Sequence, residues 1–310
     1  MFILVTGGAG FIGSNIVEHL LALNHRVRVI DNLQTGNKNN IKDFLNNPNF
    51  EFFYGDITNL ENLRKALNGI NIICHQAALG SVPRSIEDPL SSHNSNINGF
   101  LNILLVAKEY GIKRIVYASS SAVYGDEPNL PKTENIIGNP LSPYAITKYV
   151  DELYANMFSK LYDMECIGLR YFNVFGPKQD PDGAYAAVIP KFISSLKDGI
   201  APLINGDGYY SRDFTFVKNV VEANYLAMTT ENKECYGNIF NIGAGGRITI
   251  LEMYNAIKKE LGSDINPIFG DIRKGDIPHS NADISKAKNL LGYEPKIDFS
   301  AGIKITINYY

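Results

Sequence analysis

Short apolar runs alternate with helical patterns along the first half of the chain. Five runs rich in Ile, Val and Phe are bounded by Gly, Asn or Asp, namely Phe2–Val5, Arg26–Ile30, Glu51–Tyr54, Ile70–His75 and Arg114–Ala118. Segments with helical periodicity lie between them, such as Ile12–Leu23, Leu60–Leu67 and Gly99–Tyr110. Near-continuous apolar strands separated by helices are typical of a parallel sheet covered on both faces. The pattern therefore predicts a doubly wound α/β architecture, whose ligands bind beyond the carboxyl ends of the strands.

After about Leu169 this rhythm loosens, and turn-rich stretches interrupt shorter elements. They are Gly176–Gly183, Asn205–Ser211, Gly243–Gly246 and Gly270–His279. A chain of 310 residues can form two lobes, because single cores stop growing near roughly 250–300 residues. We expect a first lobe over residues 1–169, to which residues 217–242 return, and a smaller α/β substrate lobe over residues 170–310.

The amino-acid composition argues against several classes of function. The net charge of −3 comes from interleaved acidic and basic residues, without the basic stripe that a nucleic-acid partner requires. No apolar run reaches the length of a membrane span, and the apolar start carries no basic region typical of a signal peptide. Cys74, Cys166 and Cys235 are too few and too scattered for a disulfide framework or a metal cage. We therefore expect a cytoplasmic protein without a metal, a membrane anchor or a nucleic-acid partner.

A glycine-rich turn follows the first predicted strand and opens the first helix. Gly7, Gly10 and Gly13 have the spacing G-x-x-G-x-x-G. The first glycine permits a tight turn, the second lets backbone N–H groups reach a pyrophosphate, and the third lets the helix and strand pack closely. Asp31 follows eighteen residues after Gly13 and ends the second strand, where a carboxylate accepts hydrogen bonds from a ribose and repels a 2′-phosphate. The combination predicts a Rossmann site for NAD rather than NADP.

Tyr144 and Lys148 are four residues apart at the start of a predicted long helix, so that they share one helix face. A lysine cation beside a phenol favours the phenolate, which can take a proton from an alcohol while a hydride leaves the same carbon. The cluster Ser119-Ser-Ser121 follows the strand that ends at Ala118. A serine there can hydrogen-bond the same substrate oxygen. Each feature alone is common, but their order along the chain predicts a redox site.

Together these motifs resemble the extended short-chain dehydrogenase/reductases, in the branch that acts on nucleotide sugars. The resemblance spans essentially the whole chain. It rests on Thr6-Gly-Gly-Ala-Gly-Phe-Ile-Gly13, His75-Gln-Ala-Ala78, Ser119-Ser-Ser-Ala-Val-Tyr-Gly125, Tyr144-x-x-x-Lys148, Arg170-Tyr-Phe-Asn-Val174, Gly206-Asp-Gly208 with Arg212-Asp-Phe214, and Arg273-Lys-Gly-Asp276. Within this branch the chain is most similar to 4-epimerases of UDP-N-acetylated hexoses.

The resemblance implies residues for the cofactor and the substrate. NAD would contact Gly7, Gly10, Phe11, Ile12, Gly13, Asp31, Asn32, Gly36, Asp56, Ile57, Gln76, Ala77, Ala78, Leu79, Asn96, Ser119, Tyr144, Lys148 and Phe172. The UDP-sugar would contact Gly80, Ser81, Arg84, Ser120, Ser121, Tyr144, Asn173, Gln179, Ala187, Val188, Ile189, Asn205, Gly206, Arg212, Arg247, Arg273, Asp276 and Ser280. Arginines suit the diphosphate because their planar fork of donors matches its oxygens.

The implied reaction is a C4 epimerisation through a transient 4-keto sugar. Tyr144, Lys148, Ser120 and Ser121 would be catalytic. Nucleotide-sugar dehydratases and decarboxylases of this family typically place an acidic residue after the catalytic Ser or Thr, whereas Ser121 and Ala122 stand there. Neither can move protons as a carboxyl does, which disfavours dehydration.

Substrate choice stays open between several UDP-sugars. Small residues at Gly80, Ala187 and Ser280 leave room for an acetamido group, which favours UDP-GlcNAc and UDP-GalNAc. UDP-glucose and a UDP-glucuronate, whose carboxylate Arg84 or Arg247 would meet, are the alternatives. A non-catalytic NAD-binding sensor is the alternative from another class. The resemblance also implies a homodimer formed through helices around Asn98–Tyr110 and Tyr144–Tyr162.

Overall fold

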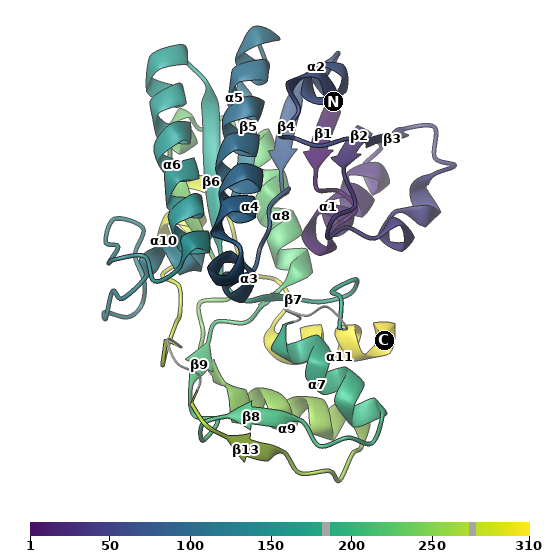
Figure 1. Cartoon of the computed structure of the whole chain (residues 1–310), viewed down its shortest axis with the longest axis vertical. Helices are drawn as coiled ribbons and strands as arrows, with labels where there is room; N and C mark the ends of the chain where they lie inside the picture. Colours follow the sequence, from purple (N-terminus) through teal and green to yellow (C-terminus); the bar gives the residue numbers. More distant parts are fainter. Residues whose placement is uncertain (182–186, 273–276) are drawn as a thin grey trace.

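The computed structural model describes residues 1–181, 187–272 and 277–310, in two lobes (Figure 1). The predicted substrate residues Arg273 and Asp276 lie outside the described residues. Within the described ranges, no helix is long and apolar enough to cross a membrane.

A seven-stranded parallel sheet forms the centre of the larger lobe, with strand order β11-β6-β5-β4-β1-β2-β3. Its strands are β1 (Phe2–Thr6), β2 (Arg26–Asp31), β3 (Phe50–Tyr54), β4 (Ile72–His75), β5 (Arg114–Ser120), β6 (Glu165–Tyr171) and β11 (Ile239–Ile242). The chain reverses its direction of winding between β1 and β4, so that a crevice opens at the carboxyl ends of these two strands. The predicted doubly wound fold is confirmed.

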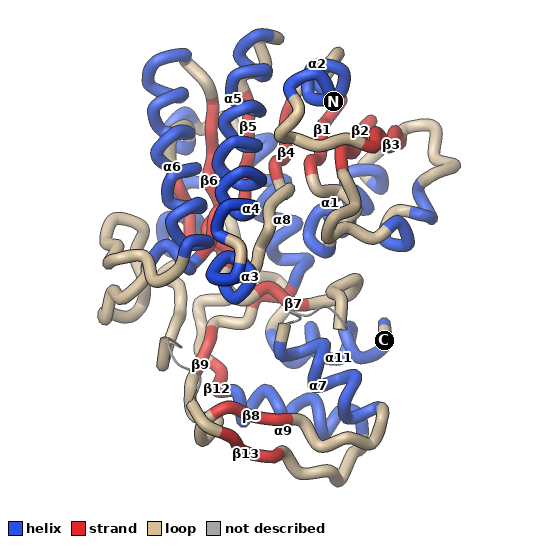
Figure 2. Tube along the Cα trace, viewed as in Figure 1, coloured by secondary structure: helices blue, strands red, loops and turns tan. Residues whose placement is uncertain are grey.

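Helices cover both faces of the sheet (Figures 1 and 2). They are α1 (Phe11–Ala22), α2 (Leu60–Leu67), α5 (Gly99–Glu109), α6 (Pro143–Tyr162) and α8 (Val217–Thr229). Alternation along β1 feeds two separate cores. Ile3 and Val5 pack with α1 and α8, whereas Leu4 packs with α2 and α5. The near-continuous apolar strands arise because the sheet is buried on both sides.

Shorter elements complete this lobe, and several of them surround the carboxyl ends of the strands. They are η1 (Lys38–Asn40), η2 (Lys42–Phe44), α3 (Val82–Glu87), α4 (Pro89–His93), η3 (Asn94–Asn98), η4 (Ser121–Tyr124), η5 (Lys233–Cys235) and α10 (Ser285–Leu291). Of these, η5 and the end of α10 lie near the amino ends of β5 and β6. The η3 segment is a π-helical turn between α4 and α5. The wider turn changes the direction in which neighbouring side chains point, and such turns often occur at functional sites.

Within the described residues, the smaller lobe is built from short strand pairs and three helices. Its elements are β7 (Val174–Phe175), α7 (Val188–Lys197), β8 (Leu203–Asn205), β9 (Ser211–Arg212), β10 (Thr215–Phe216), β12 (Ile248–Thr249), α9 (Ile250–Leu261), β13 (Ile268–Gly270) and α11 (Phe299–Tyr309). The strands pair as β10 with β7, β12 with β9 and β13 with β8. The chain passes between the lobes repeatedly, because residues 217–242 supply α8 and β11 to the larger lobe.

Candidate active site

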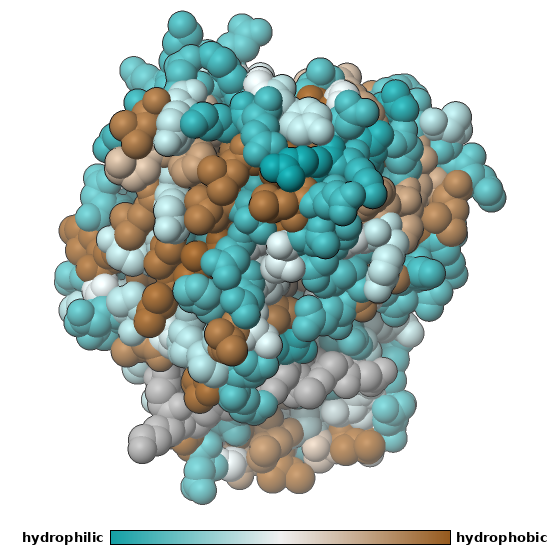
Figure 3. Space-filling model, turned by 45° about the horizontal axis from the view of Figure 1, so that its top comes forward, coloured by the Kyte–Doolittle hydropathy of each residue, from teal (hydrophilic) through white to brown (hydrophobic). Residues whose placement is uncertain are grey.

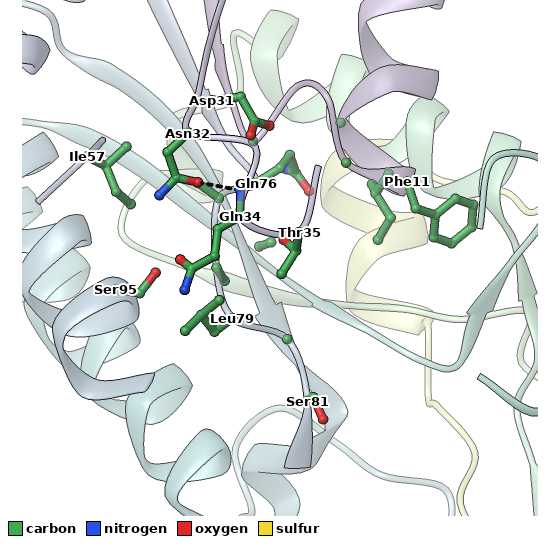
Figure 4. A pocket seen from close by; sticks show the side chains of 18 of the residues that line it. Phe11, Asp31, Asn32, Gln34, Thr35, Ile57, Gln76, Leu79, Ser81 and Ser95 are labelled. Atoms are coloured by element: carbon green, nitrogen blue, oxygen red, sulfur yellow. Dashed lines mark hydrogen bonds between the residues drawn. The ribbon is translucent and has the colours of Figure 1, made fainter. Parts of the chain in front are cut away.

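A cavity of about 460 Å³ lies at the carboxyl ends of the central strands, at the reversal between β1 and β4. Predicted residues in its lining are Gly7, Gly10, Phe11, Ile12, Gly13, Asp31, Asn32, Asp56, Ile57, Gln76, Ala77, Ala78, Leu79, Gly80, Ser81, Arg84, Ser119, Tyr144, Lys148, Gln179 and Ala187. Figure 4 shows Asp31 and Asn32 at one end of the cavity and Ser81 at the other. The structure thus brings most of the predicted cofactor residues together in one elongated site.

The glycine turn leaves no room for side chains. Gly7 has a φ of +67°, and a Cβ there would lie 2.7 Å from the backbone nitrogen of Ala77. A Cβ on Gly13 would lie 2.2 Å from the carbonyl oxygen of Gly7. Helix α1 begins at Phe11, directly after this turn, and its N-terminus borders the cavity. The close-packed backbone and the free N–H groups of the helix start fit a pyrophosphate.

Asp31 is fixed at the end of β2 by two backbone donors. Its carboxylate accepts hydrogen bonds from Ala9 N at 2.9 Å and from Leu33 N at 2.8 Å. Burial raises the pKa of Asp31, and the two N–H donors oppose that shift. A carboxylate has room for further donors beyond these two, so that it can still accept a hydrogen bond from a ribose. Nearby, Asn32 Nδ2 donates to Asp56 Oδ2 at 2.8 Å, which ties the ends of β2 and β3 together.

The loop after β4 forms the opposite wall. Thr6 Oγ1 accepts hydrogen bonds from the backbone N–H groups of Gln76 and Ala77, each at 3.2 Å. Leu79 N donates to Asn96 Oδ1 at 2.8 Å. Asn96 is buried and belongs to η3, and its amide also donates to Thr147 Oγ1. Asn96 therefore positions the loop from behind, outside the cavity lining, which differs from the predicted direct contact with cofactor.

Tyr144 and Lys148 extend from the first turns of α6 into the cavity lining. Helix α6 starts cleanly because Ser142 Oγ accepts a hydrogen bond from Ala145 N and Pro143 occupies the first position. The Lys148 side chain is only 2% exposed, and its Nζ donates to the carbonyl oxygen of Ala118 at 2.9 Å. The predicted pair thus lies beside the end of β5.

The three serines after β5 have different surroundings. Ser119 lines the cavity and donates a hydrogen bond to Glu152 Oε1. Ser120 Oγ accepts a hydrogen bond from Ala122 N at 3.1 Å and so caps η4. Ser120 and Ser121 are half-buried and lie outside the lining.

Several further predicted residues also lie outside the cavity lining. They are Gly36, Phe172, Asn173, Val188, Ile189, Asn205, Gly206, Arg212, Arg247 and Ser280. Phe172 is fully buried against Tyr124 and Ala282, and Ile189 is buried in the main core. These two side chains support the site through packing, which a motif alone does not reveal.

Arg212 and Ser280 nevertheless lie near each other. Arg212 Nη1 donates to the carbonyl oxygens of Ser211 and Pro278, at 2.9 and 3.2 Å. The backbone of Ser280 donates to the same Ser211 oxygen at 3.1 Å. Asn205 and Gly206 lie at the end of β8, beside β13. The smaller lobe thus carries its predicted residues on separate strand ends.

Sequence reasoning missed eight residues of the lining. They are Ile30, Gln34, Thr35, Gly55, Ser95, Ala118, Tyr171 and Asp180. Most of them end a parallel strand or follow one. They could have been predicted, because ligands of such sheets bind beyond the carboxyl ends of the strands. Ser95 lies in the π-helical turn, whose presence the sequence did not indicate.

The glycine cradle, Asp31 and the long cavity fit NAD, and the Tyr144–Lys148 pair adds an acid–base group. Residues 3–243 match the model of the NAD dependent epimerase/dehydratase family, and the chain belongs to this family. The carboxylate at Asp31 agrees with NAD as its cofactor.

Similar proteins span nearly the whole chain. A putative UDP-glucose 4-epimerase of Methanocaldococcus jannaschii is 43% identical over 310 residues, which cover 99% of this chain and 97% of the relative. The UDP-N-acetylglucosamine 4-epimerase of Methanobrevibacter ruminantium, solved with UDP-N-acetylmuramic acid, is 40% identical, with a TM-score of 0.93 and coverage of 99% and 97%. The UDP-glucose 4-epimerase of Thermotoga maritima, solved with UDP-glucose, is 37% identical, with a TM-score of 0.94 and coverage of 100% and 98%.

Proposed function

We propose that the protein is an NAD-dependent UDP-hexose 4-epimerase that interconverts UDP-GlcNAc and UDP-GalNAc. The observation that carries the proposal is the position of Tyr144 and Lys148, which line the same cavity as the glycine turn. The relatives described above, named as 4-epimerases of UDP-sugars, support the reaction class. Ser121 and Ala122 support epimerisation over dehydration, because neither supplies a carboxyl at the positions where related dehydratases typically carry an acidic residue.

Tyr144 and Lys148 have different roles in the proposed reaction. Tyr144 takes the proton of the sugar 4-hydroxyl as the C4–H bond breaks, which leaves a 4-keto sugar. NAD, when bound, supplies the acceptor that takes the hydride from C4 and later returns it. Lys148 extends from the same helix into the same cavity lining and places a cation near the reacting groups. Tyr144 then gives the same proton back after the sugar has turned its other face, and the configuration at C4 is inverted.

The sugar end of the cavity supports an N-acetylated substrate. Gly80 and Ala187 line this region, and a Cβ built on Gly80 has no neighbour within 4 Å. Open space beside small side chains accommodates an acetamido group. Ser280 is half-buried and lies outside the lining, so that the argument rests on the other two positions.

A substrate panel tests the proposal. The purified protein, loaded with NAD, is incubated separately with UDP-GlcNAc, UDP-glucose and UDP-glucuronate, and the products are separated by chromatography. We expect UDP-GalNAc from UDP-GlcNAc as the fastest conversion. Faster conversion of UDP-glucose or UDP-glucuronate would keep the reaction and replace the substrate. No conversion of any of them by folded, NAD-containing protein would favour the non-catalytic sensor.

We also propose that two copies associate through α5 and α6, as the family resemblance implies. Exposed apolar residues gather on these helices and on the neighbouring α3 and α4 (Figure 3, left side). They are Ile86, Leu90, Leu105, Ile146, Leu153, Met157 and Leu161. An exposed apolar patch of this kind is typical of a protein–protein interface. Light scattering after size-exclusion chromatography tests the dimer, and substitution of Leu161 by Lys should shift the mass toward the monomer.

A further inference from the structure

Asp151 is a buried carboxylate that the proposed reaction does not yet use. It lies one turn after Lys148 on α6, and its side chain is 1% exposed. Its Oδ2 is 3.4 Å from Lys148 Nζ, whereas its Oδ1 is buried without a hydrogen-bond partner. Burial of an ionised carboxylate in such surroundings costs folding free energy unless a nearby cation stabilises the charge. The position of Asp151 therefore depends on Lys148.

The adjacent carboxylate, Glu152, has very different partners. Arg170 donates to both of its oxygens at 2.8 Å, and Ser119 donates to one of them. This pair is complete without Lys148. Lys148 is thus the cation within salt-bridge distance of Asp151 among the described residues. The two neighbouring carboxylates therefore belong to two separate ion pairs.

The ammonium of Lys148 is held from two sides. It donates to the Ala118 carbonyl oxygen at 2.9 Å and lies against Asp151 at 3.4 Å. An ammonium group has three donors, so that one is left for the cavity that Lys148 and Tyr144 line. The carboxylate lies on the same helix and shares the burial of its partner. Its negative charge therefore reduces the field that Lys148 exerts on the reacting groups.

We propose that Asp151 is a positioning residue for the redox step, the counter-ion that holds Lys148 and limits its effect on Tyr144 and the cofactor. The inference rests on the proposed function. An unopposed cation beside the site would disfavour the positively charged oxidised cofactor relative to the uncharged reduced nicotinamide, so that the 4-keto sugar and reduced cofactor would accumulate. An epimerase needs both half-reactions to run at comparable rates. The Asp151 carboxylate makes the rates of sugar oxidation and of reduction of the 4-keto sugar more similar.

Other titratable groups face this pair from the neighbouring strands, and the π-helical turn η3 contributes none. They are Tyr117 on β5, His75 on β4 and Glu152 on α6 itself. Burial raises the pKa of Asp151 to about 7, against the opposing effect of Lys148. Asp151 thus gains its charge across neutral pH. Its influence on the redox balance is expected to grow over the same range.

The Asp151→Asn variant tests the counter-ion role. Wild-type and variant enzymes, loaded with NAD, are equilibrated with UDP-GlcNAc and with UDP-glucose, and enzyme-bound NADH is measured by its absorbance from about pH 6 to about pH 9. We expect the variant to hold roughly three- to tenfold more NADH at the alkaline end. The difference should fade toward pH 6. Asp163→Asn, at the C-terminal end of the same helix, is the matched control, because Asp163 is exposed and its left-handed backbone tolerates Asn.

Failure of the proposed function can be distinguished from failure of the counter-ion role. Absence of turnover by the wild type would reject the proposed function. Equal NADH fractions in an active wild type and in Asp151→Asn would overturn only the counter-ion role. Asp151→Ala repeats the test without an amide. We expect both variants to fold and retain NAD, because Lys148 keeps its hydrogen bond to the Ala118 carbonyl oxygen and its access to the cavity. Failure of both to fold would also overturn the proposal. The melting temperature of each variant against pH gives a readout that does not depend on activity.

Discussion

The two ends of the cavity are built in different ways. At the cofactor end, the turn of residues 7–13 and Asp31 come from consecutive βαβ elements, and backbone packing fixes their positions within a few ångströms. At the sugar end, Ser81 follows β4, Gln179 follows β7, and Ala187 precedes α7. A rigid frame thus holds the common part of the ligand, while loops of separate origin meet the variable part. We therefore expect substitutions at the two ends to change different properties.

The largest effect is expected at the junction of the two ends. Tyr144→Phe removes the phenol that accepts the substrate proton. We expect kcat to fall by about 10²- to 10⁴-fold, with NAD content and melting temperature close to those of the wild type. Product analysis and NAD released on denaturation measure the two quantities. Unchanged turnover would reject Tyr144 as the acid–base group.

The next effect concerns only the cofactor end. Gly13→Ala places a methyl group 2.2 Å from the Gly7 carbonyl oxygen, so that the turn must open. We expect at least a tenfold loss of bound NAD and a destabilisation of about 2 kcal/mol. Activity with every UDP-sugar should fall by the same factor. Gly246→Ala is the control, because a Cβ there has no neighbour within 4 Å. A selective loss for one sugar would contradict the division between the two ends.

A smaller and selective effect is expected at the sugar end. Gly80→Val fills space beside the cavity, where a Cβ on Gly80 has no neighbour within 4 Å. We expect kcat/KM for UDP-GlcNAc to fall by roughly tenfold relative to that for UDP-glucose. NAD content should not change. Parallel kinetics with both sugars check this ratio. An equal loss for both would remove Gly80 from the acetamido site.

The smallest effect is expected at Asp151, which is buried on α6, and concerns the pH dependence of stability. Burial raises the pKa of Asp151 to about 7 in the folded protein, above the usual value of an unfolded Asp. The folded state therefore binds this proton more tightly, and its contribution to stability is lost as pH rises toward 7. Asp151→Asn removes this loss, so that the stability of the variant relative to the wild type should rise between about pH 4 and about pH 7 and then level off. Denaturant unfolding at several pH values measures the gain. A difference that is constant with pH would contradict the shift.

The sequence predicted the cofactor end better than the sugar end for a physical reason. The glycine turn and the Tyr144–Lys148 spacing are local patterns, which the strand and helix around them convert directly into geometry. Asn96 shows the limit, since the family resemblance implied contact with the cofactor, whereas its amide oxygen accepts a hydrogen bond from Leu79 N. Only tertiary packing decides between these positions.

Asp151 illustrates a second limit. Its spacing from Lys148 is visible in the sequence, but three residues also separate many exposed pairs on helices. The proposed role of Asp151 depends on the burial of its side chain and on its Oδ1, which makes no hydrogen bond. Neither property follows from the local pattern. The placement of Ser95 by the π-helical turn is of the same kind.

The repeated passage of the chain between the lobes has a consequence for unfolding. The last strand of the sheet, β11, lies between two segments of the smaller lobe along the chain, so that removal of either lobe leaves the other without part of its core. The lobes should therefore lose structure in one cooperative transition rather than two. A ligand that bridges them should raise the temperature of that whole transition. Calorimetry with and without a UDP-sugar should then show a single peak that moves without splitting.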